Sequence, residues 1–387
     1  MNKRKLKQKI DLFLTMIFLM LLFGGVAFFG ISIFKGLTKT NEFKPKVAVE
    51  KFSEYYPTAE KVLKNMSLEE KVGQFLFARV PERNATEEID TYHLGGYILF
   101  GRDVNGFSLE QIKNKVLSWQ NEAKYGLFIG IDEEGGSVSR LTRAGLADFR
   151  SPQALFLAGG MELIKSDAIE KNQILEGIGV NVNFAPVADV ATDKNAYIFG
   201  RSFGKSASET AEFVRTIVGE SLNSNVSATL KHFPGYGNNL NTHIQTSIDE
   251  RSLEELRASD FLPFQAGIEA GVDFIMVSHN TVRQVDNVPA SLSNVFHEIL
   301  NEELGFSGLI ITDDLAMSAI TKKYSNEQAA VQAVLAGNNM LIVSNYQVAF
   351  NAILDAVKNG TITEERIDYL LLPVISLKIQ KNLIKIE

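Results

Sequence analysis

The chain has 387 residues, enough for one large domain or two ordinary ones, and its 45% apolar and 22% charged residues are typical of a folded protein. The formal net charge of −7 argues against a nucleic-acid partner, because a phosphate-binding surface needs an excess of basic residues. Cysteine is absent, which excludes a disulfide framework, a thiolate nucleophile, a zinc–thiolate site and a lipid anchor on cysteine.

The N-terminal segment predicts a membrane-spanning helix. Residues 12–34, LFLTMIFLMLLFGGVAFFGISIF, form an uncharged apolar run. A helix of that length crosses the roughly 30 Å hydrocarbon layer of a bilayer, whereas the apolar part of a cleaved signal peptide is only about 7–15 residues long. Residues 1–11 are basic, so the positive-inside bias puts them in the cytoplasm and the rest of the chain outside the cell. We therefore expect a single-pass anchor in the cell membrane, with cleavage near residue 35 as the alternative.

Beyond the anchor, residues 35–55 have the composition of a polar linker, and a folded domain is expected from residue 56 onward. Short apolar runs there alternate with longer segments of helical spacing, such as 107–124, 206–224 and 251–269. This alternation indicates βα units and a parallel sheet. Eight runs have the length of strands: residues 73–80, 95–100, 126–134, 180–190, 227–235, 272–280, 308–315 and 338–345.

Eight βα units in residues 56–387 predict an α/β fold, a closed (β/α)8 TIM-type barrel, with a doubly wound sheet as the competing arrangement. The distribution of polar residues favours the barrel. In most runs they follow the apolar part, as expected when active-site groups gather at the C-terminal mouth, although one polar strand end alone would indicate only contact with water. These strand-end residues are Asp132, Glu133, Asp189, Lys231, His232, His279, Asp313 and Asp314.

The segment ATLKHFPGYGNNLNTH, residues 228–243, holds two histidines, a lysine and several amides. His232 and His243 lack the close spacing of zinc-binding pairs, and GYGNNL lacks the third glycine of a dinucleotide fingerprint. A GxSxG serine-hydrolase elbow is absent from the sequence. We interpret the segment as a loop, hinged at Gly235 and Gly237, that carries His243 over the barrel mouth and needs an anionic partner elsewhere.

Asp313 is the candidate for that partner, because in GFSGLIITDDLAMSA it follows the seventh predicted strand. By itself, Asp313 would equally suit the N-cap of the following helix.

Seven motifs in one order resemble the family 3 glycoside hydrolases, specifically the single-barrel β-N-acetylhexosaminidases. They are GGYILFGRDV, IDEEGGSVSRL, NFAPVADV, GRSFG, KHFPGYG, GVDFIMVSHN and GFSGLIITDDLAM. The motifs extend over nearly all of the chain after the linker. The resemblance implies that residues 56–387 form the family's N-terminal-type barrel and catalyse glycoside hydrolysis with retention of configuration.

The resemblance also implies roles for single residues. Asp313 of the TDD motif matches the nucleophile that forms a covalent glycosyl-enzyme, and Asp314 is its neighbour. His243 matches a loop histidine that acts as general acid/base in this family, where most retaining glycosidases use a second carboxyl group. Other residues match sugar-binding positions, the last of them less closely: Asp132, Arg140, Arg201, Lys231, His232 and His279.

Two features depart from the family pattern. The usual D-S-H triplet is here Asn241, Thr242 and His243, so the catalytic dyad has an amide in place of its carboxylate. An amide cannot stabilise an imidazolium by charge, so the pKa of His243 should be lower than in a relative with aspartate. The family's HG pair has become Tyr236 and Gly237. Reduced catalytic activity is therefore one of the outcomes that the sequence predicts.

The sequence predicts a cofactor-free, metal-free exo-glycosidase that removes terminal β-linked N-acetylglucosamine, or another N-acetylhexosamine, from cell-wall-derived or other aminosugar glycans. The alternatives are a catalytically weakened surface glycan-binding protein and a β-glucosidase or β-xylosidase of the same family. The expected partners are a carbohydrate substrate and, through residues 12–34, the membrane, with the catalytic domain outside the cell. The glycan linkage, hydrolysis versus phosphorolysis, and the oligomeric state remain open at this level.

Overall fold

The computed structural model describes residues 51–385, apart from positions 238, 240 and 243–246. Residues Ala48–Glu387 form one compact unit. The predicted anchor at residues 12–34 and the candidate His243 lie outside the described residues. Among the residues that are described, no helix is both long and apolar enough to span a bilayer.

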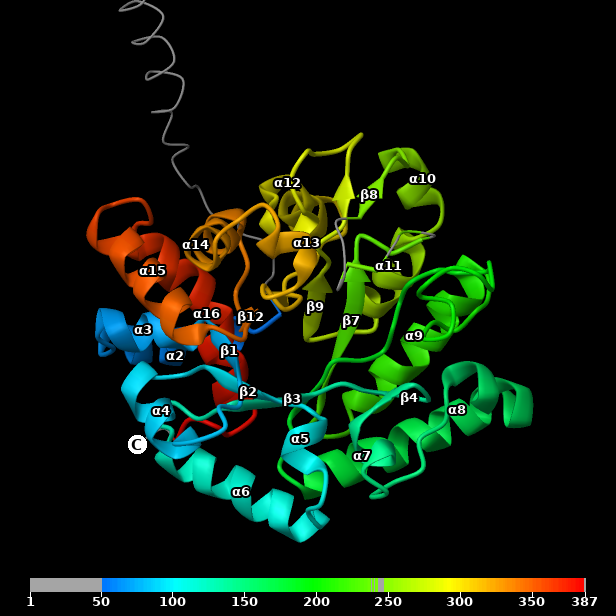
Figure 1. Ribbon diagram of the computed structural model, residues 1–387, viewed down its shortest axis with the longest axis horizontal. Coiled ribbons are helices and arrows are strands. Elements are labelled where there is room, and N and C mark those ends of the chain that lie inside the picture. Colours follow the sequence, from blue (N-terminus) through cyan, green and yellow to red (C-terminus); the bar gives the residue numbers. More distant parts are fainter. Residues whose placement is uncertain (1–50, 238, 240, 243–246, 386–387) are drawn as a thin grey trace, which may run out of the picture. The chain divides into compact units, whose positions relative to one another are not determined.

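Eight parallel strands form the centre of the fold (Figure 1). Each of the first six strands pairs with the next barrel strand along the chain, and the eighth pairs with the first. The seam between the seventh and eighth strands is spanned by a parallel bridge between Ile311 and Met340, so the barrel is nearly closed. The strands are β1 (Leu76–Arg79), β2 (Gly96–Leu99), β3 (Phe128–Ile131), β6 (Val182–Asn183), β7 (Ser227–Phe233), β9 (Phe274–Val277), β11 (Leu309–Thr312) and β12 (Leu341–Val343).

Every predicted strand run contains one of these strands, and the barrel order excludes the doubly wound alternative. Two small pairs lie outside the barrel sheet, β4 (Glu133–Gly135) with β5 (Val138–Ser139) and β8 (Ile248–Asp249) with β10 (Thr281–Val282). The short apolar runs predicted the strand positions correctly because each strand of a parallel barrel is covered on both faces and is therefore apolar almost throughout.

Helices follow the strands and surround the barrel (Figure 1). The expected helical segments 107–124 and 206–224 each contain one long helix, whereas 251–269 contains two. The second of these starts at Phe261, which puts Pro263 in its first turn, where proline is tolerated. The helices are α2 (Tyr56–Lys64), α3 (Leu68–Gln74), α4 (Ala85–Tyr92), α5 (Gly101–Val104), α6 (Leu109–Glu122), α7 (Arg140–Arg143), α8 (Pro152–Gly177), α9 (Ala207–Ser221), α10 (Leu253–Ala258), α11 (Phe261–Glu269), α12 (Asn294–Glu298), α13 (Ser318–Thr321), α14 (Asn326–Ala336), α15 (Tyr346–Lys358) and α16 (Glu364–Gln380), with shorter turns η1 (Ser53–Tyr55), η2 (Ala290–Leu292) and η3 (Ile299–Glu303).

Aromatic side chains fill the interior of the barrel. Phe77 of β1 packs edge-on against Phe184, which follows β6, with ring centroids 5.2 Å apart. Since β2 and β3 lie between these two strands, the contact crosses the barrel. A Cβ added at Gly130 of β3 would lie 2.6 Å from the Phe184 ring and 2.8 Å from the Phe77 ring. Glycine at this position therefore makes room for the aromatic core.

A buried lysine lies at the opposite end of the barrel from the strand-end carboxylates. Lys378 of α16 donates hydrogen bonds to Gln74 Oε1 at 2.6 Å and to the carbonyl of Gly126, just before β3, at 2.8 Å. Both acceptors are neutral. Burial without a counter-charge therefore lowers the pKa of Lys378 to about 7.

Replacing this lysine should flatten the pH dependence of stability. Lys378 releases its proton near pH 7 in the folded chain and near pH 10.4 in the unfolded chain, so between these values the unfolded state binds more protons. The wild-type free energy of unfolding should therefore gain up to about 1.4 kcal/mol per pH unit from this group. Urea unfolding measures this effect between about pH 7 and about pH 9. As the pH rises, the free energy of unfolding of Lys378→Met should fall further below that of the wild type.

Lys358→Met is the matched control, because that lysine is 55% exposed and pairs with Glu69 at 3.5 Å. Its difference from the wild type should not change with pH. A constant difference between Lys378→Met and the wild type over the same range would contradict the lowered pKa.

Candidate active site

The candidate site starts at the C-terminal end of β3, where Asp132 accepts hydrogen bonds from two cations. Lys231 Nζ lies 2.8 Å from its Oδ1, and Arg140 Nη2 lies 2.8 Å from its Oδ2. Burial alone would raise the pKa of Asp132, but the charges of Lys231 and Arg140 outweigh it and hold this pKa well below its usual range. The Asp132 carboxylate is therefore ionised at neutral pH, a hydrogen-bond acceptor and no source of protons.

Glu134 is a central member of the site that the sequence analysis missed. Its side chain, 2% exposed, lies 2.6 Å from Lys231 Nζ and accepts a two-pronged interaction from Arg201, at 2.7 Å from Nη2 and 3.0 Å from Nε. Despite burial, the charges of Lys231 and Arg201 lower the pKa of Glu134 to about 2. In turn, Asp132 and Glu134 outweigh the effect of burial and raise the pKa of Lys231. Asp132, Glu134, Lys231 and Arg201 form one buried, charge-balanced chain, and Arg140 adds a further positive charge at the Asp132 end.

His232 is held in a single orientation at the end of β7. Its Nδ1 lies 2.7 Å from Asp189 Oδ2, and its Nε2 lies 3.3 Å from Arg201 Nη2. A guanidinium group only donates hydrogen bonds, so Nε2 accepts and the hydrogen on Nδ1 is donated to Asp189. The sequence analysis placed Asp189 among the polar strand ends but not among the predicted site residues. Its pairing with His232 follows only from the fold.

The two neighbouring aspartates after β11 have different surroundings. Asp313 is partly buried, and its Oδ1 accepts a hydrogen bond from the backbone N–H of Asp314 at 2.8 Å. The Asp314 carboxyl group accepts from Ala316 N at 2.9 Å and from Ser344 Oγ at 3.0 Å, and burial raises its pKa. Asp314 therefore fastens the turn to the strand end of β12. Burial is the main cause that raises the pKa of Tyr236, in the loop after β7, and the charge of Asp313 acts in the same direction.

His279 is fully buried behind this turn. Its Nε2 donates to the carbonyl oxygen of Asp314 at 2.9 Å, so its Nδ1 accepts from the Ser291 hydroxyl at 2.7 Å. His279 therefore supports the Asp314 turn, and the sugar contact expected from the sequence stays a prediction.

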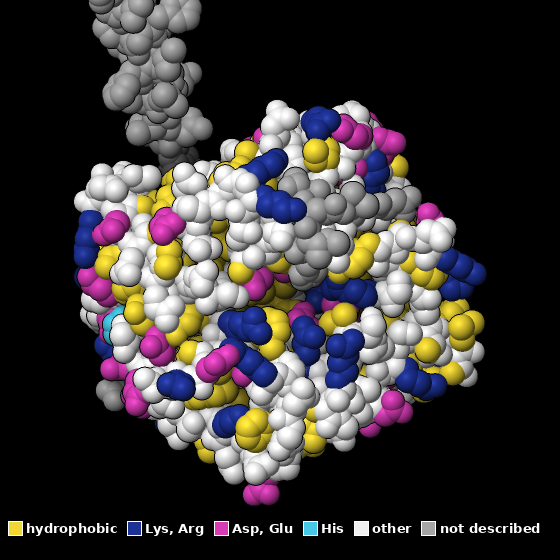
Figure 2. Space-filling model, viewed as in Figure 1, with side chains coloured by type: hydrophobic (Ala, Val, Ile, Leu, Met, Phe, Trp, Pro, Cys, Tyr) yellow, Lys and Arg dark blue, Asp and Glu magenta, His cyan; other side chains and the backbone are white. Residues whose placement is uncertain are grey.

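The fold thus brings most of the predicted site residues to one end of the barrel. Asp132, Arg140, Arg201, Lys231 and His232 are joined through hydrogen bonds and ion pairs, and Glu134 and Asp189 complete the network. Figure 2 shows basic and acidic side chains around a hollow in this face of the molecule. Asn241 is partly buried, and His243 lies outside the described residues. In the described part of the chain, no group of three or more histidine or carboxylate residues is placed to hold a metal ion.

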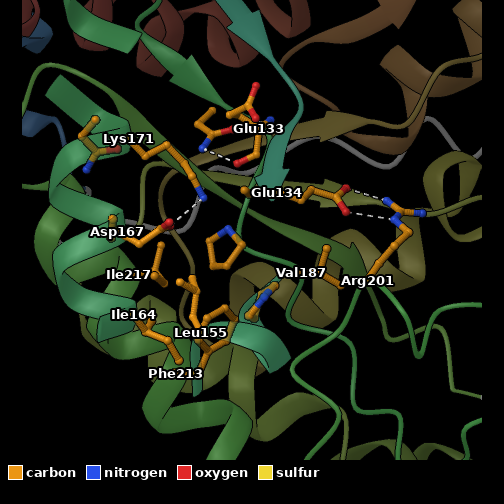
Figure 3. Close-up of a pocket in the computed structure, with 16 residues that line it drawn as sticks. Glu133, Glu134, Leu155, Ile164, Asp167, Lys171, Val187, Arg201, Phe213 and Ile217 are labelled. Carbon is orange, nitrogen blue, oxygen red and sulfur yellow. Dashed lines mark hydrogen bonds and ion pairs between the residues drawn. The ribbon is translucent and has the colours of Figure 1, made fainter. Parts of the chain in front are cut away.

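A cavity lies behind the network, between α8, α9 and the chain after β6 (Figure 3). Its empty volume is about 490 Å³ when the solvent at its opening is included. Glu134 and Arg201 belong to both its wall and the network, but much of the wall is apolar: Leu155, Ile164, Val187, Phe213 and Ile217. Neither Asp132 nor Lys231 lines it. Glu133, Asp167 and Lys171 also line the cavity, so its wall carries charged groups besides those that it shares with the network.

Comparison with known proteins identifies the family. Residues 67–377 match the sequence profile of the glycosyl hydrolase family 3 N terminal domain. The chain belongs to this family. It is 34% identical over 269 residues to a beta-hexosaminidase of Idiomarina loihiensis, a match that covers 68% of this chain and 80% of that protein. A beta-hexosaminidase of Stenotrophomonas maltophilia is also 34% identical over 269 residues, covering 67% of this chain and 79% of that protein.

A solved structure of another family 3 protein has the same barrel as this chain. It is the glycoside hydrolase family 3 beta-N-acetylglucosaminidase from Paenibacillus sp. str. FPU-7, with a TM-score of 0.78 and 33% sequence identity. The match covers 82% of the present chain but 63% of the Paenibacillus chain, so this protein spans less than two thirds of that structure.

Glu134→Gln should cost this family 3 hydrolase much of its stability. The substitution removes the charge that balances Lys231 and Arg201 in a buried setting, and loss of one partner from such a pair costs about 3 kcal/mol or more. Urea unfolding near neutral pH measures the loss. Glu269→Gln, which weakens an exposed pair with Arg215, should cost less than about 1 kcal/mol. Equal effects of the two substitutions would contradict the role given to Glu134.

Proposed function

We propose that this family 3 hydrolase is a retaining exo-glycosidase that hydrolyses terminal β-linked N-acetylglucosamine from cell-wall-derived or other aminosugar glycans. The observation that carries the proposal is the fixed set of charged donors and acceptors around Asp132 and Lys231, at the same end of the barrel as Asp313. Ionised groups of this kind form strong, directional hydrogen bonds to sugar hydroxyls. The beta-hexosaminidase relatives and the Paenibacillus beta-N-acetylglucosaminidase support this choice of substrate.

In the proposed mechanism, Asp313 attacks the anomeric carbon and forms a covalent glycosyl-enzyme, which water then hydrolyses. Asp314 is a poor candidate for this role because its carboxyl group is engaged by Ser344 and Ala316. The two steps also need a group that protonates the leaving oxygen and later takes a proton from water.

His243 is the proposed acid/base. Asp132 is unsuited, because its carboxylate stays ionised between Lys231 and Arg140. His232 is unsuited as well, because its Nε2 accepts from Arg201 and its Nδ1 hydrogen is committed to Asp189. This elimination supports the residue that the sequence resemblance indicates.

Asn241 sets the expected pH behaviour. Without a carboxylate at this position, the imidazolium form of His243 loses a stabilising charge, so its pKa should be lower than in relatives with aspartate. The acid step then fails first as the pH rises, and the enzyme should prefer mildly acidic conditions. Asn241 is also the observation that favours the second candidate, a surface protein that binds such glycans with little turnover.

Two variants should separate the roles of Asp313 and His243. Asp313→Ala should lower kcat by several orders of magnitude on every substrate, because it removes the covalent step. His243→Ala should harm methyl N-acetyl-β-glucosaminide far more than the 4-nitrophenyl glycoside, since a good leaving group needs little protonation. Steady-state kinetics of the full-length chain on both substrates provide the measurement.

A slow fluorinated substrate should label Asp313, and mass spectrometry of the labelled peptide identifies the residue. Label on Asp314 would overturn the assignment of the nucleophile. Wild-type protein that binds N-acetylglucosamine but turns over neither glycoside would instead support the glycan-binding alternative.

We further infer that residues 12–34 anchor the protein in the cell membrane, with residues 1–11 inside, a linker at 35–55 and the catalytic barrel outside. The long uncharged run supports this proposal. Lys51, at the start of the described chain, donates to the carbonyl of Gly271 and pairs with Asp273 at 2.5 Å, both just before β9. Lys51 therefore lies at the end of the barrel opposite to the strand-end carboxylates.

Mass measurement of the membrane-extracted protein tests the anchor. We expect a mass that includes residues 1–34, because the uncharged run at residues 12–34 is longer than the roughly 7–15 apolar residues of a cleaved signal peptide. A mature N-terminus near residue 35 would point to a secreted enzyme.

A further inference from the structure

We propose that Tyr236 is a positioning residue for the acid/base step, acting through Thr242, the residue directly before His243. The inference rests on the proposed function, in which His243 exchanges protons with the leaving group and with water. Tyr236 occupies one of the two places where this chain departs from the family pattern, and its hydroxyl group contacts a residue of the other.

The phenol of Tyr236 makes two contacts with Thr242. The backbone N–H of Thr242 donates to the Tyr236 hydroxyl oxygen at 2.8 Å, and the two side-chain hydroxyl groups lie 2.7 Å apart. Burial is the main cause that raises the pKa of Tyr236, so the phenol keeps its hydrogen and can donate it to Thr242 Oγ1 while accepting from the backbone. Tyr236 is 2% exposed and Thr242 is 1% exposed, so water cannot readily replace either bond.

Tyr236 is itself fixed to the sugar-binding network. Its backbone N–H donates to Asp189 Oδ1 at 2.6 Å, and the other oxygen of the same carboxylate holds His232. The ring packs edge-on against the His232 imidazole, with centroids 5.5 Å apart, and also contacts Tyr197 at 5.6 Å. The phenol therefore has a rigid base at the end of β7.

Thr242 is also held from the opposite side. Its carbonyl oxygen accepts a hydrogen bond at 3.2 Å from the backbone N–H of Ala319, in α13. Helix α13 belongs to the connection that begins with Asp313 at the end of β11. Thr242 thus joins the loop of the proposed acid/base to the loop of the proposed nucleophile. The phenol of Tyr236 holds Thr242 on one side of this junction, and the backbone of α13 holds it on the other.

A separate ion-pair cluster holds the base of the same loop. Arg251 Nη2 lies 2.7 Å from Asp249 Oδ2 and 3.2 Å from the carbonyl of Gly235, and Arg251 Nη1 lies 2.8 Å from Asp260 Oδ2. Asn239 donates to the same Asp249 oxygen at 2.8 Å. These contacts tie the two ends of the loop together, whereas the Tyr236 phenol reaches the residue before His243.

The physical consequence concerns proton transfer. A general acid must lie within hydrogen-bond reach of the leaving oxygen, and a displacement of about 1 Å can cost roughly 100-fold in rate. Removal of the phenol leaves the buried N–H of Thr242 without its acceptor, which favours a shift of this part of the loop. Attack by Asp313 on a substrate with a good leaving group needs little protonation, so loss of the phenol should affect this step much less.

Tyr236→Phe in the full-length chain is the direct test, because it deletes only the hydroxyl group. We expect kcat/KM for methyl N-acetyl-β-glucosaminide to fall by about tenfold or more, and kcat/KM for the 4-nitrophenyl glycoside to change by less than about threefold. The matched control is Tyr97→Phe, since Tyr97 is fully buried and donates to the Ala85 carbonyl at 2.7 Å on the β2 side of the barrel. That variant should treat both substrates alike.

Combination with His243→Ala identifies the route of the effect. If Tyr236 acts through His243, then Tyr236→Phe should cause no further loss on the methyl glycoside once the imidazole is gone. A full additional loss in the double variant would overturn the proposal and give Tyr236 a separate role.

Thr242 variants keep the proposal testable if Tyr236→Phe folds poorly. Thr242→Ser keeps the hydroxyl group and should behave like the wild type, whereas Thr242→Val should show the same preference for the nitrophenyl substrate as Tyr236→Phe. If His243→Ala discriminates between the substrates but Tyr236→Phe and Thr242→Val do not, this inference fails while the proposed function stands. If the wild type hydrolyses neither glycoside, the proposed function itself fails.

Discussion

The active site is organised around one buried positive charge, the ammonium group of Lys231. A charge without a partner is very costly inside a protein, and Lys231 is stable there because Asp132 and Glu134 lie 2.8 and 2.6 Å from its Nζ. Each carboxylate then carries a second cation, Arg140 on Asp132 and Arg201 on Glu134. The need to balance Lys231 therefore fixes the ends of β3 and β7 relative to each other, together with the donors and acceptors that a sugar would meet.

The barrel separates this polar end from its floor, the end at which the strands begin. The C-terminal ends of all the parallel strands lie at the same end of the barrel. Polar residues that follow different strands therefore come together there. At the other end, Lys378 is buried with neutral acceptors only, and the chain enters the barrel beside Asp273. Charge at the mouth is balanced by partners of opposite sign, whereas the charge at the floor is tolerated because Lys378 gives up its proton easily.

Two kinds of residue share the mouth. Asp132, Lys231 and His232 lie on or directly after strands and have partners that leave them one orientation, as substrate-positioning groups require. Asn241 and Thr242 belong to a loop, which tolerates sequence change more easily than a barrel strand does. The departures from the family pattern are concentrated in this loop. The contact between Tyr236 and Thr242 joins two positions at which the sequence departs from the family pattern.

The sequence by itself determined the barrel, its eight strands and the end at which charged side chains gather, because apolar runs and the polar residues that follow them are local properties of the chain. It did not determine which side chains meet. Glu133 and Glu134 are adjacent and chemically alike, yet alternation along β4 directs Glu133 to the backbone of Leu141 and Glu134 to Lys231. Likewise, nothing near His279 in the sequence indicates that its Nε2 lies 2.9 Å from the carbonyl oxygen of Asp314. Only the tertiary structure decides such pairings, because the partners are far apart in the chain and meet through the packing of different strands.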